Sequence, residues 1–469
     1  MAVSLLATAP AWAVDWQFNP YVSEQLSVSN TSGQGGGSGS DNGDGLAART
    51  TVGTNTRATG RRLKLTADAA LAMVNRTDGR TVDLEQNLHG LSTLELVPNR
   101  FLVDANLSST RELVSTTSPV SGAGAGTDNN NRTSVTSVSI SPYWQQRYGR
   151  WAQSLARYRH TEVIGSGGDS NDSRNDSVEL QLVAGHKLQP WRPALTGEWT
   201  NIDERGSAGS TPNDLTRYSL AFSNQLGLSR RYSLTGSIGY DNVDAPTQTR
   251  DLSGISWSIG AIGRPGPRSS FDLSFGQRYG EWAVNGTASY ALTSHLSMRL
   301  SAKQSLGTGL QDFVNDSNLV TVDPITGELV TPGGTPVGFL DRGIDNQISV
   351  SQSVETSLIG DYGRNRITVS SYVERRNFDV GNEDLVRVRG VVTRRLSPDL
   401  SATLASFYRY TKPTIEATSH TVNARFDLNY RLGRRTTVFA GYSYTTRRSS
   451  DTTLEYDEHV ASVGGRISF

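Results

Sequence analysis

Alternation of apolar and polar residues along extended segments is the feature that most constrains how this chain folds. In residues 421–432 every second position is apolar and the residues between are polar. The apolar set is Val422, Ala424, Phe426, Leu428, Tyr430 and Leu432. Successive side chains of a β-strand point to opposite faces, so one face of such a segment suits lipid and the other suits water. The same pattern recurs at 62–73 and 281–292.

The length of these segments separates two kinds of all-β protein. Strands of a soluble sandwich also alternate but are typically about five or six residues long, whereas a strand that crosses a bilayer at a tilt needs about nine to eleven. The alternating segments here run for about ten to fourteen residues. Composition agrees, because 35% hydrophobic residues and a mean hydropathy of -0.42 fit a wall in which only alternate residues meet lipid. The sequence therefore predicts an all-β fold, an antiparallel transmembrane β-barrel.

The connections between these segments fall into two classes that take turns along the chain. Short turns are predicted at 60–61, 98–99, 149–150, 189–191, 229–230, 265–267, 293–294, 361–363, 397–399 and 433–434. Mostly longer, polar loops are predicted at 30–45, 115–133, 164–176, 203–214, 243–251, 307–344, 377–384, 411–419 and 447–455. Outer-membrane barrels have short turns in the periplasm and long loops outside. Counting gives about 22 strands, and the brief connections at 75–80 and 278–281 leave about 18 to 20 open.

Both ends of the chain suggest export to the outer membrane of a Gram-negative bacterium. Residues 1–13 resemble a signal peptide that ends in a small-x-small cleavage site, although the usual positive start is missing, so we expect upstream residues to have been lost. Alternation begins almost at Val14, which predicts residues 14–469 as a barrel without a plug domain. The last strand ends at Phe469, and a terminal aromatic residue of this kind resembles the insertion signal read by the barrel-assembly machinery.

Several functional classes find no support in the residues. The chain has no cysteine, which removes thiolate chemistry, and its formal charge of zero gives no bulk attraction to nucleic acid. The six histidines are scattered over different segments, without a serine or carboxylate at a recognisable catalytic spacing. No pair of histidines at metal-ligand spacing and no calcium loop is present. We therefore predict a non-enzymatic protein with no metal and no cofactor.

Basic residues on the predicted water-facing side are candidates for lining a lumen. The set is Arg299, Lys303, Arg387, Arg389, Arg425 and Arg431. Arginine forms paired hydrogen bonds with anionic groups, so such a lumen suits anionic or hydroxyl-rich solutes. The alternative is that these charges only keep a water-filled pore soluble. Aromatic residues near the turns are candidates for interfacial girdles, namely Tyr148, Trp151, Trp191, Tyr232, Tyr279 and Trp282.

Two segments carry a resemblance to a known family. Residues 14–30, Val-Asp-Trp-Gln-Phe-Asn-Pro-Tyr and onward, resemble the first strand of the PEP-CTERM system-associated outer-membrane protein family, and residues 94–108, which begin Leu-Glu-Leu-Val-Pro-Asn-Arg-Phe, are similar to one of its hairpins. The family is encoded near exosortase and exopolysaccharide loci. The resemblance implies a role in the cell envelope, with exopolysaccharide and its export proteins as partners. It brings no catalytic residues with it.

The leading hypothesis from the sequence is thus an outer-membrane barrel that serves an exosortase-linked exopolysaccharide system as a conduit or assembly partner. A general diffusion porin is the alternative, and an outer-membrane enzyme is a distant third. Their structural marks differ, because a porin folds a long loop inward as a constriction and an enzyme shows a polar triad at the rim. The loop 307–344 is the constriction candidate, since its prolines and glycines break strand pairing. The sequence leaves open whether it folds inward or outward.

Overall fold

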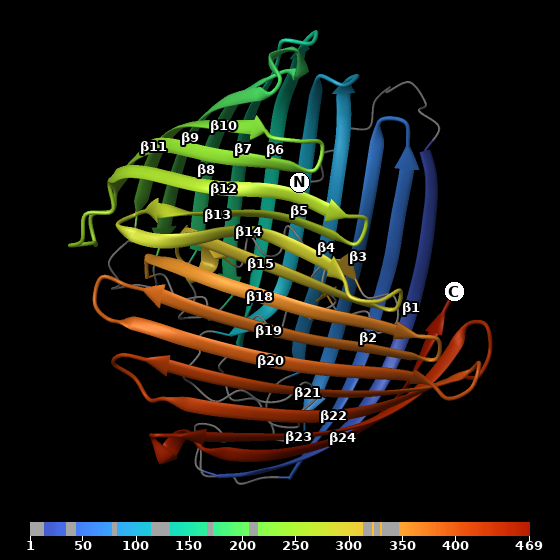
Figure 1. Cartoon of the computed structure of the whole chain (residues 1–469). Helices are drawn as coiled ribbons and strands as arrows, with labels where there is room; N and C mark the ends of the chain where they lie inside the picture. The colour runs from blue at the N-terminus through green and yellow to red at the C-terminus, as the bar shows by residue number, and fades with distance from the viewer. Residues whose placement is uncertain are drawn as a thin grey trace, which may run out of the picture.

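The chain forms one closed antiparallel β-barrel of 22 strands (Figure 1). The computed structural model describes residues 14–33, 44–76, 82–113, 132–166, 172–205, 214–312, 321–322, 329–330 and 347–469. Each strand of the wall pairs with the next along the sequence, and the last pairs with the first, as Val28 opposite Ala461 illustrates. Closure pairs the backbone groups of every strand and leaves no open edge.

The first half of the wall consists of β1 (Val14–Ser32), β2 (Asp44–Gly60), β3 (Leu63–Arg76), β4 (Asp83–Val97), β5 (Phe101–Leu113), β6 (Arg132–Tyr148), β7 (Ala152–Ser166), β8 (Asp172–Ala184), β9 (Trp191–Arg205), β10 (Leu215–Gly227) and β11 (Tyr232–Asp244). The second half consists of β12 (Gly254–Gly266), β13 (Ser269–Arg278), β14 (Glu281–Ala291), β15 (Leu296–Gly307), β18 (Ser349–Tyr362), β19 (Asn365–Asn377), β20 (Asn382–Arg395), β21 (Leu400–Pro413), β22 (Ser419–Arg431), β23 (Thr436–Ser449) and β24 (Tyr456–Ser468).

A few small elements lie outside the wall. The strands β16 (Thr321–Val322) and β17 (Leu329–Val330) pair only with each other. Two short 3-10 helices, η1 (His186–Leu188) and η3 (Thr452–Leu454), occur in connections, and residues 309–312 form one helical turn. Within the residues that the structure describes, no helix has both the length and the apolar character needed to cross a bilayer.

The strand number of about 22 is confirmed, and the lower numbers are excluded. Both doubtful connections join paired strands. Arg278 and Glu281 are partners across a two-residue turn, in which Tyr279 and Gly280 both have positive φ, as the tight hairpin turns that match strand twist require. β3 and β4 pair as far as Val74 opposite Asp83.

The alternation also has the predicted geometry. Large apolar side chains such as Val422 and Phe426 lie exposed on the outer face, and the polar residues between them face inward. Thr287 and Ala288 fall on opposite faces of β14, with Ala288 outside opposite Phe271 of β13. The outer face is therefore apolar around the barrel, as an outer-membrane-type β-barrel requires.

All ten predicted short turns lie at one end of the barrel, called here the short-turn end, and the predicted longer loops lie at the other, the long-loop end. Several loops are shorter than predicted. β1 continues to Ser32 and β2 starts at Asp44, within the predicted loop 30–45, and the loop 164–176 loses residues to β7 and β8. Backbone pairing does not need apolar side chains, so strands continue in polar sequence beyond the lipid-facing band. Residues 115–131 of the loop 115–133 lie outside the described residues, as do residues 1–13.

One girdle residue was assigned wrongly. Tyr148, Trp151, Trp191, Tyr232 and Trp282 are exposed on the outer surface near the strand ends. Tyr279, in contrast, is only 5% exposed, because the β13–β14 turn folds beneath a neighbouring loop. Its hydroxyl accepts a hydrogen bond from Arg217 Nη1 at 2.9 Å.

Candidate functional site in the barrel lumen

Charged side chains that face inward near the long-loop end are almost wholly shielded from solvent. Glu374 and Arg376 on β19 are each 1% exposed, and Glu458 on β24 is equally buried. Pairing offsets the cost of removing such groups from water. Ser351 Oγ donates to Glu374 Oε1 at 2.7 Å, and Arg376 Nη1 lies 3.3 Å from Glu383 Oε2. Inward-facing groups that lined open water would be exposed, so other groups of the chain pack over these side chains.

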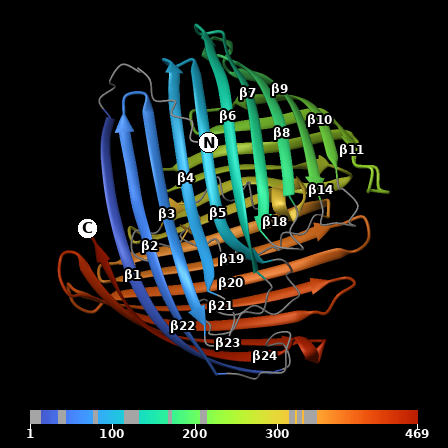
Figure 2. The ribbon, with the colours of Figure 1, turned by 180° about the vertical axis from the view of Figure 1, so that it is seen from behind.

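The helical turn 309–312 is one of the groups that pack over the inner face of the wall. It follows β15, and Leu310 is 1% exposed where it packs against Val135 of β6 and Val163 of β7. Those strands lie across the lumen from β15 in the order of the wall. Figure 2 shows the turn in gold inside the barrel. The start of the predicted constriction loop therefore folds inward.

Polar contacts hold the same segment to the facing wall. Gln311 accepts a hydrogen bond from Asn175 Nδ2 at 2.8 Å and donates one to Ser173 Oγ at 3.2 Å, both on β8. Thr308 Oγ1 donates to Glu204 Oε1 at the end of β9 at 2.5 Å. We call residues 308–312 the gate segment. Leu310 and these three hydrogen bonds hold the gate segment against β6, β7, β8 and β9.

A second connection, residues 245–253 between β11 and β12, passes over the short β13–β14 turn and reaches the β19–β20 connection. Asp379, in the β19–β20 connection, accepts hydrogen bonds from Thr249 N at 3.0 Å, Thr249 Oγ1 at 2.8 Å and Arg250 N at 3.1 Å. Arg250 also pairs with Glu281 at 3.0 Å. The hydrogen bond from the Thr249 hydroxyl is the main cause that lowers the pKa of Asp379, and backbone hydrogen bonds and the Arg250 charge act the same way. We call residues 245–253 the strap.

The predicted lumen residues face inward but do not form a single site. Arg299 and Lys303 lie on β15, with Arg299 exposed and Lys303 half-buried. The other four lie on β20 and β22, where Arg425 Nε contacts Asp427 Oδ2 at 2.8 Å and Arg431 is exposed near the short-turn end. Arg387 is buried and Arg389 half-buried.

Three further arginines of this wall were not predicted from the sequence. Arg387 stands directly opposite Arg409 of β21, and Arg376 and Arg447 face inward from β19 and β23. Their signal was available, because each occupies the polar position of an alternating segment. Once the pairing register of the barrel is known, it places these arginines in one region of the inner wall.

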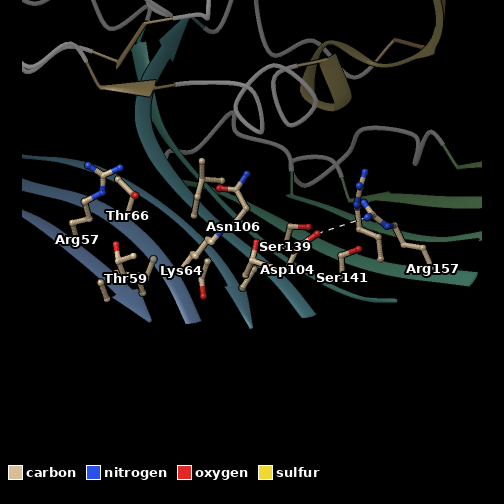
Figure 3. Close-up of a pocket in the computed structure, with 16 residues that line it drawn as sticks. Arg57, Thr59, Lys64, Thr66, Asp104, Asn106, Ser139, Ser141 and Arg157 are labelled. Carbon is tan, nitrogen blue, oxygen red and sulfur yellow. Dashed lines mark hydrogen bonds and ion pairs between the residues drawn. The ribbon is translucent and has the colours of Figure 1, made fainter. Parts of the chain in front are cut away.

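A polar recess lies in the wall formed by β2 to β7, on the lumen side (Figure 3). It has a volume of 580 Å³. Figure 3 shows Arg57 at one end and Arg157 at the other, with Asp104 and Asn106 between them. Other lining residues include Lys64, Thr66, Ser139, Ser141 and Arg159. This set was not predicted from the sequence, since its members come from six strands and only the pairing register unites them.

No group of three or more potential metal ligands occurs in the described part of the chain. One histidine pairs with a carboxylate, since His160 Nδ1 lies 2.8 Å from Asp176 Oδ1. His420 and His459 face outward, each with its Nδ1 at 2.8 Å from a tyrosine hydroxyl, of Tyr408 and Tyr442 respectively.

Comparisons with known proteins relate the fold to solved outer-membrane receptors. No protein-family model matches the chain, and no curated protein matches it either. The siderophore receptor PirA from Acinetobacter baumannii is similar in structure, with a TM-score of 0.51, 11% sequence identity, and coverage of 96% of this chain and 80% of the receptor chain. A mutant of the ferric enterobactin receptor PfeA from Pseudomonas aeruginosa, in complex with enterobactin, gives a TM-score of 0.51, 12% identity, and coverage of 96% and 81%.

At this identity the likeness concerns the fold alone. The chain has an outer-membrane-type β-barrel fold, with siderophore receptors among its structural neighbours. About a fifth of each receptor chain lies outside the match. The absence of a plug domain therefore stays a prediction from the sequence.

Proposed function

We propose that this protein is a non-enzymatic β-barrel of the bacterial outer membrane that acts as a gated conduit or assembly partner in an exosortase-linked exopolysaccharide system. The observation that carries the proposal is a wide barrel in which connections of the chain fold over the wall near one end. A 22-stranded wall encloses a lumen too wide for side chains to fill. The gate segment packs on the inner face of the wall, the strap joins the β11–β12 and β19–β20 connections, and inward-facing charges at the same end are buried.

The attachment of the gate segment favours a gate over a permanent wall. Leu310 and three hydrogen bonds attach this segment to the facing strands, whereas neighbouring strands of the wall share ten or more residue pairs in most cases. The gate segment can therefore leave its place while the barrel stays intact. Below the gate the wall is lined with hydroxyl, amide and guanidinium groups, which suit a hydrated, hydroxyl-rich polymer.

A general diffusion porin remains the second candidate, and one observation favours it. The inward course of residues 308–312, at the start of the β15–β18 connection, is also what a constriction loop does. In a porin the constriction leaves a permanent opening, so the intact protein would conduct steadily. The ligands of the siderophore receptors are not carried over to this chain, since the likeness is one of fold.

A reversible lock tests the proposed function in cells. The chain has no cysteine, so Leu310→Cys with Val163→Cys introduces one specific cross-link between gate segment and wall. In a host whose own gene is deleted, we expect surface polysaccharide to fall, the unmodified gene to restore it, and the double variant to restore it only under reducing conditions. The Leu310→Cys variant alone serves as the control. Unchanged surface polysaccharide after the gene deletion would show that the proposed function is wrong.

A further inference from the structure

The recess between β2 and β7 differs in charge from an ordinary pore wall. Four cationic side chains line it, and Asp104 is the one carboxylate among its lining residues, all of which the structure describes. The cations are Arg57, Lys64, Arg157 and Arg159. The recess lies toward the short-turn end, because Lys64 is the second residue of β3 and Asp104 the fourth of β5. It is thus separate from the gate segment.

Asp104 positions Arg157 and forms no ion pair with Arg57 or Lys64. Its Oδ1 accepts a hydrogen bond from Thr93 Oγ1 at 2.9 Å, and its Oδ2 lies 3.7 Å from Arg157 Nη2. The guanidinium of Arg157 also stacks over the ring of Tyr143, 4.4 Å from its centre. Both contacts fix the direction of this side chain. In the described part of the chain, Arg57 and Lys64 have no ion-pair partner, so the recess keeps a positive field that attracts anions.

Hydroxyl and amide groups surround these cations. Thr59, Thr66, Ser139 and Asn106 contribute donors and acceptors, and Ser139 already accepts a hydrogen bond from Thr161 at 3.2 Å. Ser141 is 3% exposed, yet its Oγ has no hydrogen-bond partner within the described residues. A buried polar atom without a partner is costly and uncommon. A ligand hydroxyl seated in the recess would satisfy it.

We propose that this recess binds an anionic saccharide, with an acidic group paired to Arg57, Lys64 or Arg157 and ring hydroxyls hydrogen-bonded to the serine and threonine side chains. A volume of 580 Å³ falls within the range of about 300–1,000 Å³ usual for small-molecule sites. This inference rests on the proposed function in one respect, which is the choice of a saccharide as the class of ligand. Binding itself requires neither the gate nor export.

Binding to the purified full-length protein in detergent tests the site, with calorimetry as the measurement. The probes are tri-galacturonate, which carries carboxylates, and maltotriose, a neutral trisaccharide. We expect tri-galacturonate to bind at least about tenfold more tightly, the difference that one charge-assisted hydrogen bond supplies. Arg57→Gln and Lys64→Gln should each weaken it by about tenfold. Ser141→Ala should weaken it by about threefold without lowering the melting temperature, because no hydrogen bond within the described residues is lost.

A matched control separates a site from general charge attraction. Arg192 is exposed on the inward face of β9 and lies outside the recess, so Arg192→Gln should leave the affinity unchanged. Equal affinity for both trisaccharides, displacement of tri-galacturonate by sodium sulfate at matched ionic strength, or an equal loss in Arg192→Gln would each overturn the proposal. The two experiments can also give different answers. If the purified protein binds tri-galacturonate but deletion of its gene leaves surface polysaccharide unchanged, the site is supported and only the proposed function is refuted.

Discussion

Removing the apolar anchor of the gate segment should open the barrel without unfolding it. In the closed state Leu310 is 1% exposed between Val135 and Val163. Replacing a buried leucine by alanine costs roughly 2–5 kcal/mol. We take about 2–3 kcal/mol, because a site at the mouth of a lumen can relax and admit water. Since Leu310→Ala affects the closed state alone, the ratio of open to closed gates should rise roughly 30- to 150-fold.

Single-channel recording in planar bilayers measures this ratio as open probability. The intact protein should give low or flickering conductance, and Leu310→Ala should give openings of the same size that occupy far more of the record. The barrel's thermal unfolding should shift little, because the wall's backbone pairing is untouched. Leu220→Ala, on the exposed outer face of β10, is the control and should leave open probability unchanged. A Leu310→Ala record identical to that of the intact protein would refute the assignment of the gate segment.

Further predictions concern the whole connection, the lipid face, the orientation and the strap. Deleting residues 310–342 should raise conductance several-fold, and a large steady conductance that the deletion does not change would favour the porin. Ala288→Arg or Leu428→Arg should reduce insertion by about 2–4 kcal/mol and Thr287→Arg far less, as measured by folding into vesicles, and equal effects at 287 and 288 would contradict the register. A cysteine at Gly327 should react with an impermeant maleimide on intact cells while one at Pro398 stays unlabelled, and the reverse would invert the orientation. Because the pKa of Asp379 is lowered in the folded protein, its contribution to the strap is present above the carboxyl's ordinary pKa and lost as pH falls through the lowered value. Openings should therefore become more frequent on acidification, and Asp379→Asn should remove this dependence. An unaltered pH profile in that variant would exclude Asp379 as its source.

The wall of the barrel could be predicted from the sequence because its physical rule repeats. Each strand must present apolar residues such as Phe426 to one side and polar residues to the other, and the sequence states this rule in every segment. One doubtful connection, 278–281, fitted the same rule because Tyr279 and Gly280 supply a two-residue turn, and the other joins strands that pair as far as Val74 and Asp83. The girdle assignment of Tyr279 failed for a different reason. Proximity to a turn predicts depth along the barrel axis but not which side of the wall the ring occupies.

The interior could not be predicted, because its contacts follow no period. Leu310 stands in a glycine-rich connection, and nothing around it in the sequence indicates a partner on β6 or β7. The recess depends on six strands being placed in register, so Arg57 and Arg157 line the same recess only after the whole wall between them has formed. Single residues therefore define the gate and the recess, whereas many interchangeable residues define the wall.

The wall and the gate segment should respond differently to substitution. Backbone hydrogen bonds hold the wall, and a conservative side-chain change removes none of them, so one substitution alters a small part of the free energy that keeps the barrel closed on itself. The gate segment contacts the wall through a few side chains, so loss of Leu310 or of the Gln311 amide should remove a much larger share of its stabilisation. Variants of the gate should for this reason change conductance at constant barrel stability, whereas variants of the lipid face change insertion at constant gating.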